Sequence, residues 1–227
     1  MMKDVKLTPE KAVVIGRKAI ISDLHIGLEN YLQERGVSIP RIQIDEIVRR
    51  TKKIIEKYKI KELIIAGDLK HEFGRTLPYE LKDIKYFIES IDTKISVVRG
   101  NHDNYIAHIL ADYGIELRDY VKVKGYYVVH GHKEVDFDRV IMGHEHPSVK
   151  MRIRGGLYSY PCYLKADNRI LVLPAFSPLV SGNNILQGFI SPMLKKARKI
   201  EIFGICDEVV YLGTVDDLKK LIMHELC

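Results

Sequence analysis

Side chains of the types that bind metal ions follow five short apolar segments of this sequence. In chain order, the residues directly after these segments are Asp23 and His25, Asp68, Asn101-His102-Asp103, His130, and His144-Glu145-His146. Short segments rich in Val and Ile predict buried strands, and open α/β sheets bind ligands beyond the carboxyl ends of their strands. Five strand ends that carry carboxylate, amide and imidazole groups therefore predict a site for two metal ions.

The expected ligands offer oxygen and imidazole nitrogen but no thiolate. Mixed ligands of this kind suit Mn, Fe, Ni, Co or Zn, whereas a structural zinc site usually closes with cysteine. A carboxylate has two oxygens, so it can bridge two ions that lie about 3.5–4 Å apart and activate a shared water. We expect two divalent transition-metal ions per chain, with Mn as the first choice and Ni, Fe, Co or Zn as alternatives.

The spacing within the motifs suggests how the ligands are presented. Residues two apart on a strand project to the same side, so we expect Asp23 and His25 to reach one ion together. The same argument brings His144 and His146 to one region. Glycine, which permits a close approach of the chain to an ion, directly precedes three expected ligands, at Gly67, Gly100 and Gly143.

Length and composition indicate one soluble domain. The chain has 227 residues, of which 46% are hydrophobic and 29% charged, and these are globular values. We expect a single domain over residues 1–227. The sequence shows neither an apolar stretch of membrane-spanning length nor a secretion signal at its start, so we expect a cytoplasmic protein without a membrane partner. Its widely separated cysteines, expected to be reduced, are Cys162, Cys206 and Cys227.

The charge pattern leaves nucleic acid open as a partner. The formal net charge is +6, which would speed the approach of a polyanionic substrate but does not by itself indicate nucleic-acid binding. Two basic clusters, at 49–53 and 195–199, are more typical of solvated helix or loop faces than of a phosphate track. The oligomeric state stays open.

The elements expected in the first half alternate between strand and helix. Strands are expected over 12–15, 18–22, 63–67 and 95–100, and a helical or loop segment over 28–35. Amphipathic helices are expected over 41–59 and 79–90, and a short helix over 105–112. The order strand, helix, strand predicts a parallel pairing.

Short strands follow one another quickly in the second half, and turns between them predict antiparallel pairings. These strands are expected over 115–117, 120–123, 126–129, 139–142, 149–153, 157–164, 169–173, 200–203 and 208–212. A helix is expected over 215–223. Together the elements predict an α/β fold, a four-layer αββα sandwich of two mixed β-sheets flanked by helices.

The motifs resemble those of the calcineurin-like metallophosphoesterase superfamily. The blocks that carry the resemblance are Asp23-x-His25, Gly67-Asp68, Gly100-Asn101-His102-Asp103, His130-Gly131-His132 and Gly143-His144-Glu145-His146. Within the superfamily, the start Asp-Leu-His-Ile-Gly and the form Gly-Asp-Leu-Lys-His71 are similar to archaeal phosphoesterases related to SbcD-type repair nucleases. Those nucleases carry a further DNA-binding region for which this chain has no comparable length. The resemblance therefore favours phosphoester hydrolysis over DNA processing.

The resemblance also implies roles for single residues. The first metal would be held by Asp23, His25, Asp68 and His146. The second would be held by Asp68, Asn101, His130 and His144, with Asp68 bridging. It implies that His102 is the catalytic imidazole, which contacts the substrate phosphate or protonates the leaving oxygen. Asp103 would orient His102 and support its charge, although Asp103 could also cap a following helix.

Three functions follow as hypotheses. The first is a dinuclear metal-dependent phosphodiesterase that uses a hydroxide between the ions. The second is a nuclease or cyclic-nucleotide end-processing enzyme. The third is a scaffold without catalysis, like a retromer subunit of similar fold that lost its catalytic histidine, whereas this chain keeps His102. Residues expected near the site without a fixed role are His71 and His132. Core packing or base stacking is open for Tyr158, Tyr160 and Tyr163.

Overall fold

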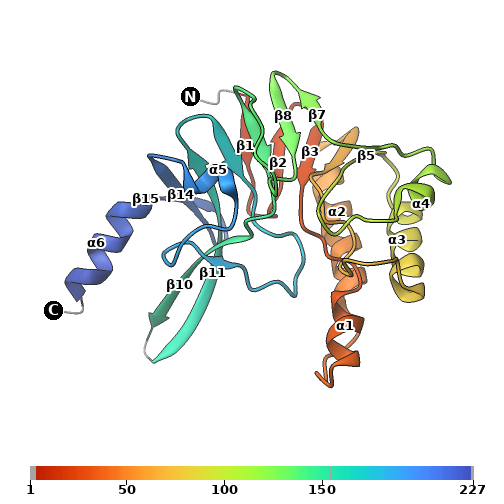
Figure 1. Ribbon diagram of the computed structural model, residues 1–227, viewed down its shortest axis with the longest axis horizontal. Helices are drawn as coiled ribbons and strands as arrows, with labels where there is room; N and C mark the ends of the chain where they lie inside the picture. The colour runs from red at the N-terminus through yellow and green to blue at the C-terminus, as the bar shows by residue number, and fades with distance from the viewer. Residues whose placement is uncertain (1–3, 154, 226–227) are drawn as a thin grey trace.

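A computed structural model describes residues 4–153 and 155–225 (Figure 1). Each of its two sheets is built from one half of the chain. The first sheet has the order β1-β2-β3-β4-β5-β6. Its strands are β1 (Val5–Leu7), β2 (Val13–Ile15), β3 (Lys18–Ile21), β4 (Glu62–Ile65), β5 (Lys94–Val98) and β6 (Leu117–Arg118).

The second sheet has the order β13-β10-β11-β12-β9-β8-β7, and β14 pairs with both β11 and β15. Its strands are β7 (Val121–Val123), β8 (Tyr126–Val129), β9 (Val140–Met142), β10 (Pro147–Ile153), β11 (Gly156–Ala166), β12 (Ile170–Val172), β13 (Asn183–Asn184), β14 (Ile200–Ile205) and β15 (Val209–Thr214). The chain passes from the first sheet to the second between β6 and β7, which are adjacent in sequence. The paired strands β10 and β11 extend away from the body of the molecule (Figure 1).

The helices are α1 (Leu28–Glu34), α2 (Gln43–Tyr58), α3 (Pro78–Ser90), α4 (Ala107–Ala111), α5 (Pro192–Lys195) and α6 (Val215–Glu225). Helix α2 buries residues spaced three or four apart, such as Ile44, Ile47 and Ile54, against the first sheet, as an amphipathic helix does. Among the described residues, no helix combines the length and the apolar content that a membrane crossing requires.

Three apolar clusters separate the layers. One lies between α2, α3, α4 and the outer face of the first sheet. A second joins the inner faces of the two sheets, where Ile20 and Ile64 pack in one cluster with Val128 and Ile141. The third lies on the outer face of the second sheet, with α5 and the start of α6. The predicted four-layer αββα sandwich of two mixed sheets is confirmed, with a thinner second helical layer.

Parallel pairing aligns the strand ends that matter for function. Strands β3, β4 and β5 are parallel, and Ile21 pairs with Ile65, which pairs with Val97. Strands β8 and β9 are also parallel, and Val129 pairs with Met142. Within each sheet, the carboxyl ends of these strands therefore lie along one edge. The two edges meet, because the N–H of His144 after β9 donates to Asp23 after β3 and His130 after β8 lies beside Asn101 after β5.

The second half contains the antiparallel pairings expected there, such as β7 with β8 and β10 with β11. It also contains the parallel neighbours β8 with β9 and β9 with β12, because the chain crosses over between them. Strands β1 and β13 and helix α5 were not expected from the sequence. Each has only two to four residues, which is too few for a recognisable pattern. Cys162 is buried and Cys206 exposed, and both are free thiols; Cys227 lies outside the described residues.

Candidate metal centre

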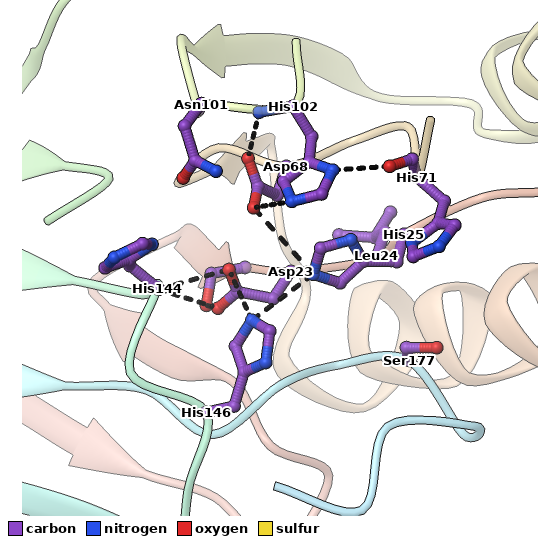
Figure 2. A network of polar contacts seen from close by, with 12 residues as sticks. Asp23, Leu24, His25, Asp68, His71, Asn101, His102, His144, His146 and Ser177 are labelled. Carbon is purple, nitrogen blue, oxygen red and sulfur yellow. Dashed lines mark hydrogen bonds and ion pairs between the residues drawn. The ribbon is translucent and has the colours of Figure 1, made fainter. Parts of the chain in front are cut away.

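Two groups of three ligand-type side chains lie where the strand ends of the two sheets meet. Figure 2 shows Asp23, His25 and His146 of the first group beside Asp68 and His144 of the second. In each group the ligand atoms lie within 4.8 Å of one another. The first group consists of Asp23, His25 and His146, and the second of Asp68, His130 and His144. Asn101 joins the second group, because its Oδ1 lies 3.0 Å from His130 Nε2. The structure thus brings together all seven residues that the sequence suggested as metal ligands.

Asp68 lies between the two groups. Its Oδ2 is 3.3 Å from His130 Nε2 in the second group and 3.8 Å from His25 Nε2 in the first. Within the first group, His146 Nε2 lies 3.2 Å from Asp23 Oδ1 and 3.3 Å from His25 Nε2. One carboxylate oxygen therefore faces donors of both groups, as a residue that bridges two ions would.

The ligands are presented by turns of the backbone, not by strand periodicity. The segments that follow β3 and β4 run side by side, and the N–H of His25 donates to the carbonyl of Asp68 at 3.0 Å. Five expected ligands have φ between +46° and +67°, namely Asp23, His25, Asp68, His144 and His146. Non-glycine residues adopt this left-handed region seldom and at a cost. The expectation that residues two apart on a strand share a side was wrong in its geometry, although it named the right partners.

Glycines make room for the carboxylates. A Cβ on Gly143 would lie 2.5 Å from Asp23 Oδ2 and 2.5 Å from Ser22 Oγ, and a Cβ on Gly100 would collide with Asp68 Oδ1. These distances are far below an ordinary contact. Gly100 and Gly143 therefore have a steric reason for being glycine, in line with the expected close approach of the chain to the site.

Burial and neighbouring charges separate the ionisation states of the ligands. Burial and then the charge of His146 lower the pKa of His25 to about 3. Burial also lowers the pKa of His144 to about 4, with the charge of His130 as the next cause. Neutral imidazoles are the form that binds metals.

His130 behaves in the opposite way. Burial acts to lower its pKa, but the hydrogen bond and the charge of Asp68 outweigh burial and raise the pKa to about 9. For Asp68, burial acts to raise the pKa, but the hydrogen bond from His130 and its charge bring the pKa below the usual value. The buried carboxylates thus draw positive charge to this position.

The orientation of His130 and the types of ligand atom suit divalent ions. His130 Nδ1 lies 3.0 Å from the carbonyl of Ala66 and can donate a hydrogen bond to it. In the neutral ring the lone pair of Nε2 is then available to bind a metal ion on the side of Asp68 and Asn101. A hydrogen bond of this kind commonly fixes the orientation of metal-binding histidines. With oxygen and imidazole donors only, the residues fit a pair of divalent transition-metal ions.

His102 is positioned by the loop after Asp68. Its Nδ1 donates to the backbone carbonyl of His71, and its backbone N–H donates to Asp68 Oδ1 at 3.0 Å. The rings of His71 and His102 stack with centroids 5.7 Å apart. Their ligand atoms form a third group with one of His25, again within 4.8 Å. His71 therefore lies at the site, while His132 packs against His130 with ring centroids 5.3 Å apart.

Asp103 does not orient His102 in the way expected. It is fully buried and accepts the backbone N–H groups of Gly100, Asp68 and Leu69, each at 2.8 Å. The first helical turn after it begins at Ala107, so Asp103 is not its cap. Asp103 instead ties together the loops that follow β4 and β5, because the neighbouring turns leave these donors unpaired. Burial and the charge of Asp68 raise the pKa of Asp103 to about 6.

Two supporting residues were missed in the sequence. Gln43 Nε2 donates to the carbonyl of His25 at 2.9 Å and to Ser177 Oγ at 3.1 Å. The buried carboxylate of Glu80 accepts the N–H groups of His71 and Glu72 at 3.2 and 2.7 Å. A glutamate in the first turn after Pro78 is a known helix-start signal, but its contact with the His71 loop depends on tertiary structure.

Comparisons with solved structures find several similar proteins. The Pseudomonas putida nuclease MPE has a TM-score of 0.67 and 21% identity, over 92% of this chain and 94% of the nuclease. The Escherichia coli phosphoesterase Yfce has a TM-score of 0.43 and 16% identity, over 87% of this chain and 97% of that protein. Entamoeba histolytica Vps29 complexed with zinc has a TM-score of 0.35 and 14% identity, over 86% and 98%. The first likeness shows a shared fold.

A comparison with curated protein sequences gives no match. Residues 16–136 match the calcineurin-like phosphoesterase family, and this range contains Asp23, His25, Asp68, Asn101 and His130. The match covers more than half of the chain. The protein belongs to the calcineurin-like phosphoesterase family.

Proposed function

We propose that this protein is a dinuclear metal-dependent phosphodiesterase. The observation that carries the proposal is the position of Asp68 between two compact groups of ligand atoms. Asp23, His25, Asp68 and His146 would hold one divalent ion. Asp68, Asn101, His130 and His144 would hold the other. Mn is the first choice for both, and Ni, Fe, Co or Zn are alternatives.

The chemistry divides between the ions and the chain. When bound, a pair of divalent ions neutralises phosphoryl charge and lowers the pKa of a coordinated water. Asp68 and Asp23 fix the positions of the positive charge, and His130 is held by the Ala66 carbonyl with Nε2 toward the site. His102 has Nδ1 engaged by the His71 carbonyl, so its Nε2 can contact the phosphoryl oxygens or exchange a proton with the leaving oxygen.

The surroundings favour a diester over a monoester. In the described part of the chain, no Lys or Arg side chain forms an ion pair or hydrogen bond with the seven expected ligands. A monoester carries a second negative charge near neutral pH and would need further cations around its phosphate. A diester carries one negative charge, which matches two ions whose expected ligands have no Lys or Arg side chain bonded to them.

The test begins with protein that has been stripped of metal and refilled with Mn²⁺. We expect about two ions per chain by elemental analysis and hydrolysis of bis-p-nitrophenyl phosphate. Asp68→Asn should lose bound metal and at least about 100-fold in kcat/KM, more than changes beyond the direct ligands usually cost. His102→Gln should keep both ions and lose about 100-fold or more in kcat.

A matched control is His108→Gln, because His108 is an exposed histidine on α4 and should leave both measurements unchanged. Full metal content and full turnover in Asp68→Asn would refute the bridging role. Binding of a single ion at saturation with undiminished hydrolysis would refute the dinuclear mechanism.

Nucleic acid or cyclic nucleotides form the alternative substrate class. The basic clusters at 49–53 and 195–199 add no support, because Arg49, Arg50 and Lys196 are engaged locally. Arg50 donates to the carbonyl of Phe176 at 2.8 Å, and Lys196 pairs with Glu134 at 2.7 Å. Support for a nucleotide substrate comes instead from a cavity beside the metal centre. The scaffold hypothesis predicts no turnover in the Mn²⁺ assay, and closeness to SbcD-type nucleases stays a prediction.

A further inference from the structure

A cavity of about 320 Å³ adjoins the second ligand group. It lies where the two halves of the chain meet. Arg99 follows β5 of the first sheet, Tyr120 precedes β7, and His130 follows β8 of the second sheet. Phe137, from the segment between β8 and β9, also lines the cavity. The expected metal ligand His130 therefore forms part of the cavity wall.

Two aromatic rings of the cavity wall, Tyr120 and Phe137, pack together with Tyr127 behind them. The ring of Phe137 stacks on Tyr127 with centroids 3.9 Å apart and an interplanar angle of 7°. The Tyr120 ring lies 5.5 Å from each of these rings. Tyr120 is nevertheless 48% exposed, so it does not serve the core. An exposed ring held by two others is a preformed surface for stacking.

Basic groups stand beside the rings. Arg99 and Lys133 line the cavity and are both exposed. The nearest partner of Arg99 is Asp119, at 3.6 Å between Nε and Oδ1, and the Asp119 side chain is 89% exposed. An ion pair this open is weak, so the guanidinium of Arg99 can turn to a phosphate. Aromatic faces interleaved with cationic groups are the means by which proteins hold single-stranded nucleic acids and their bases.

We propose that this cavity binds a nucleobase next to the phosphoester that is hydrolysed, with the base stacked on Tyr120. The inference rests on the proposed phosphodiesterase function and narrows its substrate to nucleotide-containing phosphodiesters. The volume of the cavity is at the small end of the range for ligand sites, which suits a single base. Because His130 belongs both to the cavity wall and to the second ligand group, a base in the cavity places its own phosphate at the metal centre.

The experiment compares two esters that release the same p-nitrophenolate. One is the p-nitrophenyl ester of thymidine 5′-phosphate, and the other is ethyl p-nitrophenyl phosphate, which has no base. In the Mn²⁺ protein, Tyr120→Ala should raise KM for the thymidine ester about 10-fold and leave KM for the ethyl ester within about twofold. Tyr120→Phe should restore the thymidine ester to near its original KM, because the ring suffices for stacking.

Tyr86→Ala is the matched control, since Tyr86 is 45% exposed and lies on α3. Equal effects of Tyr120→Ala on both esters, or no effect on either, would overturn the base-binding role. Titration of thymidine 5′-monophosphate by calorimetry gives a reading independent of turnover. If the wild type hydrolyses neither ester, the proposed function fails. In that case, weaker nucleotide binding by Tyr120→Ala still supports base binding in the cavity, and unchanged binding rejects it.

Two sources of the base are separated by further substrates. Single-stranded oligothymidylate and a 2′,3′-cyclic nucleotide are compared in the wild type and Tyr120→Ala. A selective rise in KM for the oligonucleotide assigns the cavity to a nucleic-acid strand. A selective rise for the cyclic nucleotide assigns it to a free nucleotide. The absence of a rise for both contradicts the inference.

Discussion

Replacement of Gly143 by alanine gives the sharpest test of how the backbone shapes the metal centre. The added Cβ would lie 2.5 Å from Asp23 Oδ2, 2.5 Å from Ser22 Oγ and 2.6 Å from Ser22 Cβ. Ordinary van der Waals contact needs about 3.4 Å or more, so one side must move by about 0.9 Å. Neither Asp23 nor Ser22 can yield easily, because both are fully buried and Ser22 Oγ is hydrogen-bonded to Asp23 Oδ2 at 2.7 Å.

The shift falls on two expected ligands at once. The N–H of His144 donates to both carboxylate oxygens of Asp23 at 3.1 Å, so the displacement moves Asp23 and the segment that carries His144. A misplacement of about 1 Å costs on the order of 100-fold in rate. We therefore expect Gly143→Ala to lose about 100-fold in kcat/KM and to bind Mn²⁺ more weakly. Overpacking of about 1–3 kcal/mol should lower Tm by about 2–12 °C in a domain of this size.

The assay measures kcat/KM on bis-p-nitrophenyl phosphate, metal content and Tm in the same preparations. Gly74→Ala serves as the control, because its Cβ would meet only Glu72 Oε1, at 4.0 Å. A Gly143→Ala protein with full metal content, activity within twofold of the wild type and an unchanged Tm would refute the steric argument.

Two further predictions concern residues outside the ligand set. Glu80 holds the His71 loop, so Glu80→Gln should lower the free energy of unfolding by about 2 kcal/mol and reduce kcat with metal content unchanged. Urea unfolding and turnover measure these two effects, with the exposed Glu89→Gln as the control. Equal behaviour of the two variants contradicts the prediction. Burial and then the charge of Arg50 lower the pKa of Lys11 from 10.5 to about 8, so the folded state binds this proton less tightly than the unfolded state. Stability should therefore be reduced below pH 8 and recover by up to about 3 kcal/mol as the pH rises from 8 to 10.5. Urea unfolding across this range should show the recovery relative to Lys11→Met, and a constant difference between the two proteins rejects it.

The sequence predicted most of the architecture because its strands and helices have strong local patterns. The helix predicted over 41–59 is found over Gln43–Tyr58, and the strand predicted over 126–129 is found there. The short elements β1, β13 and α5 have too few residues for a pattern. Parallel pairing of β8 with β9 depends on which strands become neighbours, and turn residues between them do not encode that choice.

The candidate site was predictable in its members but not in its local geometry. Asp68 follows β4 of the first sheet and His130 follows β8 of the second. The packing of the inner faces of the two sheets against each other brings these strand ends together. The left-handed backbone at Asp23 and His25 is imposed by the two loops that run side by side, so strand periodicity could not predict it. The contacts of Asp103 with backbone N–H groups likewise appear only when the loops after β4 and β5 meet.

The division of the chain into two sheets has a consequence for assembly. In the described part of the chain, the crossing from one sheet to the other lies between Arg118 and Val121. Each of the two groups proposed to hold an ion takes residues from both sides of that crossing. A cut at this crossing would leave the strands of each sheet on one fragment while splitting both sets of ligands. Hydrolysis by a mixture of the two fragments would then report directly on their reassociation, because neither fragment alone holds a complete set of donors.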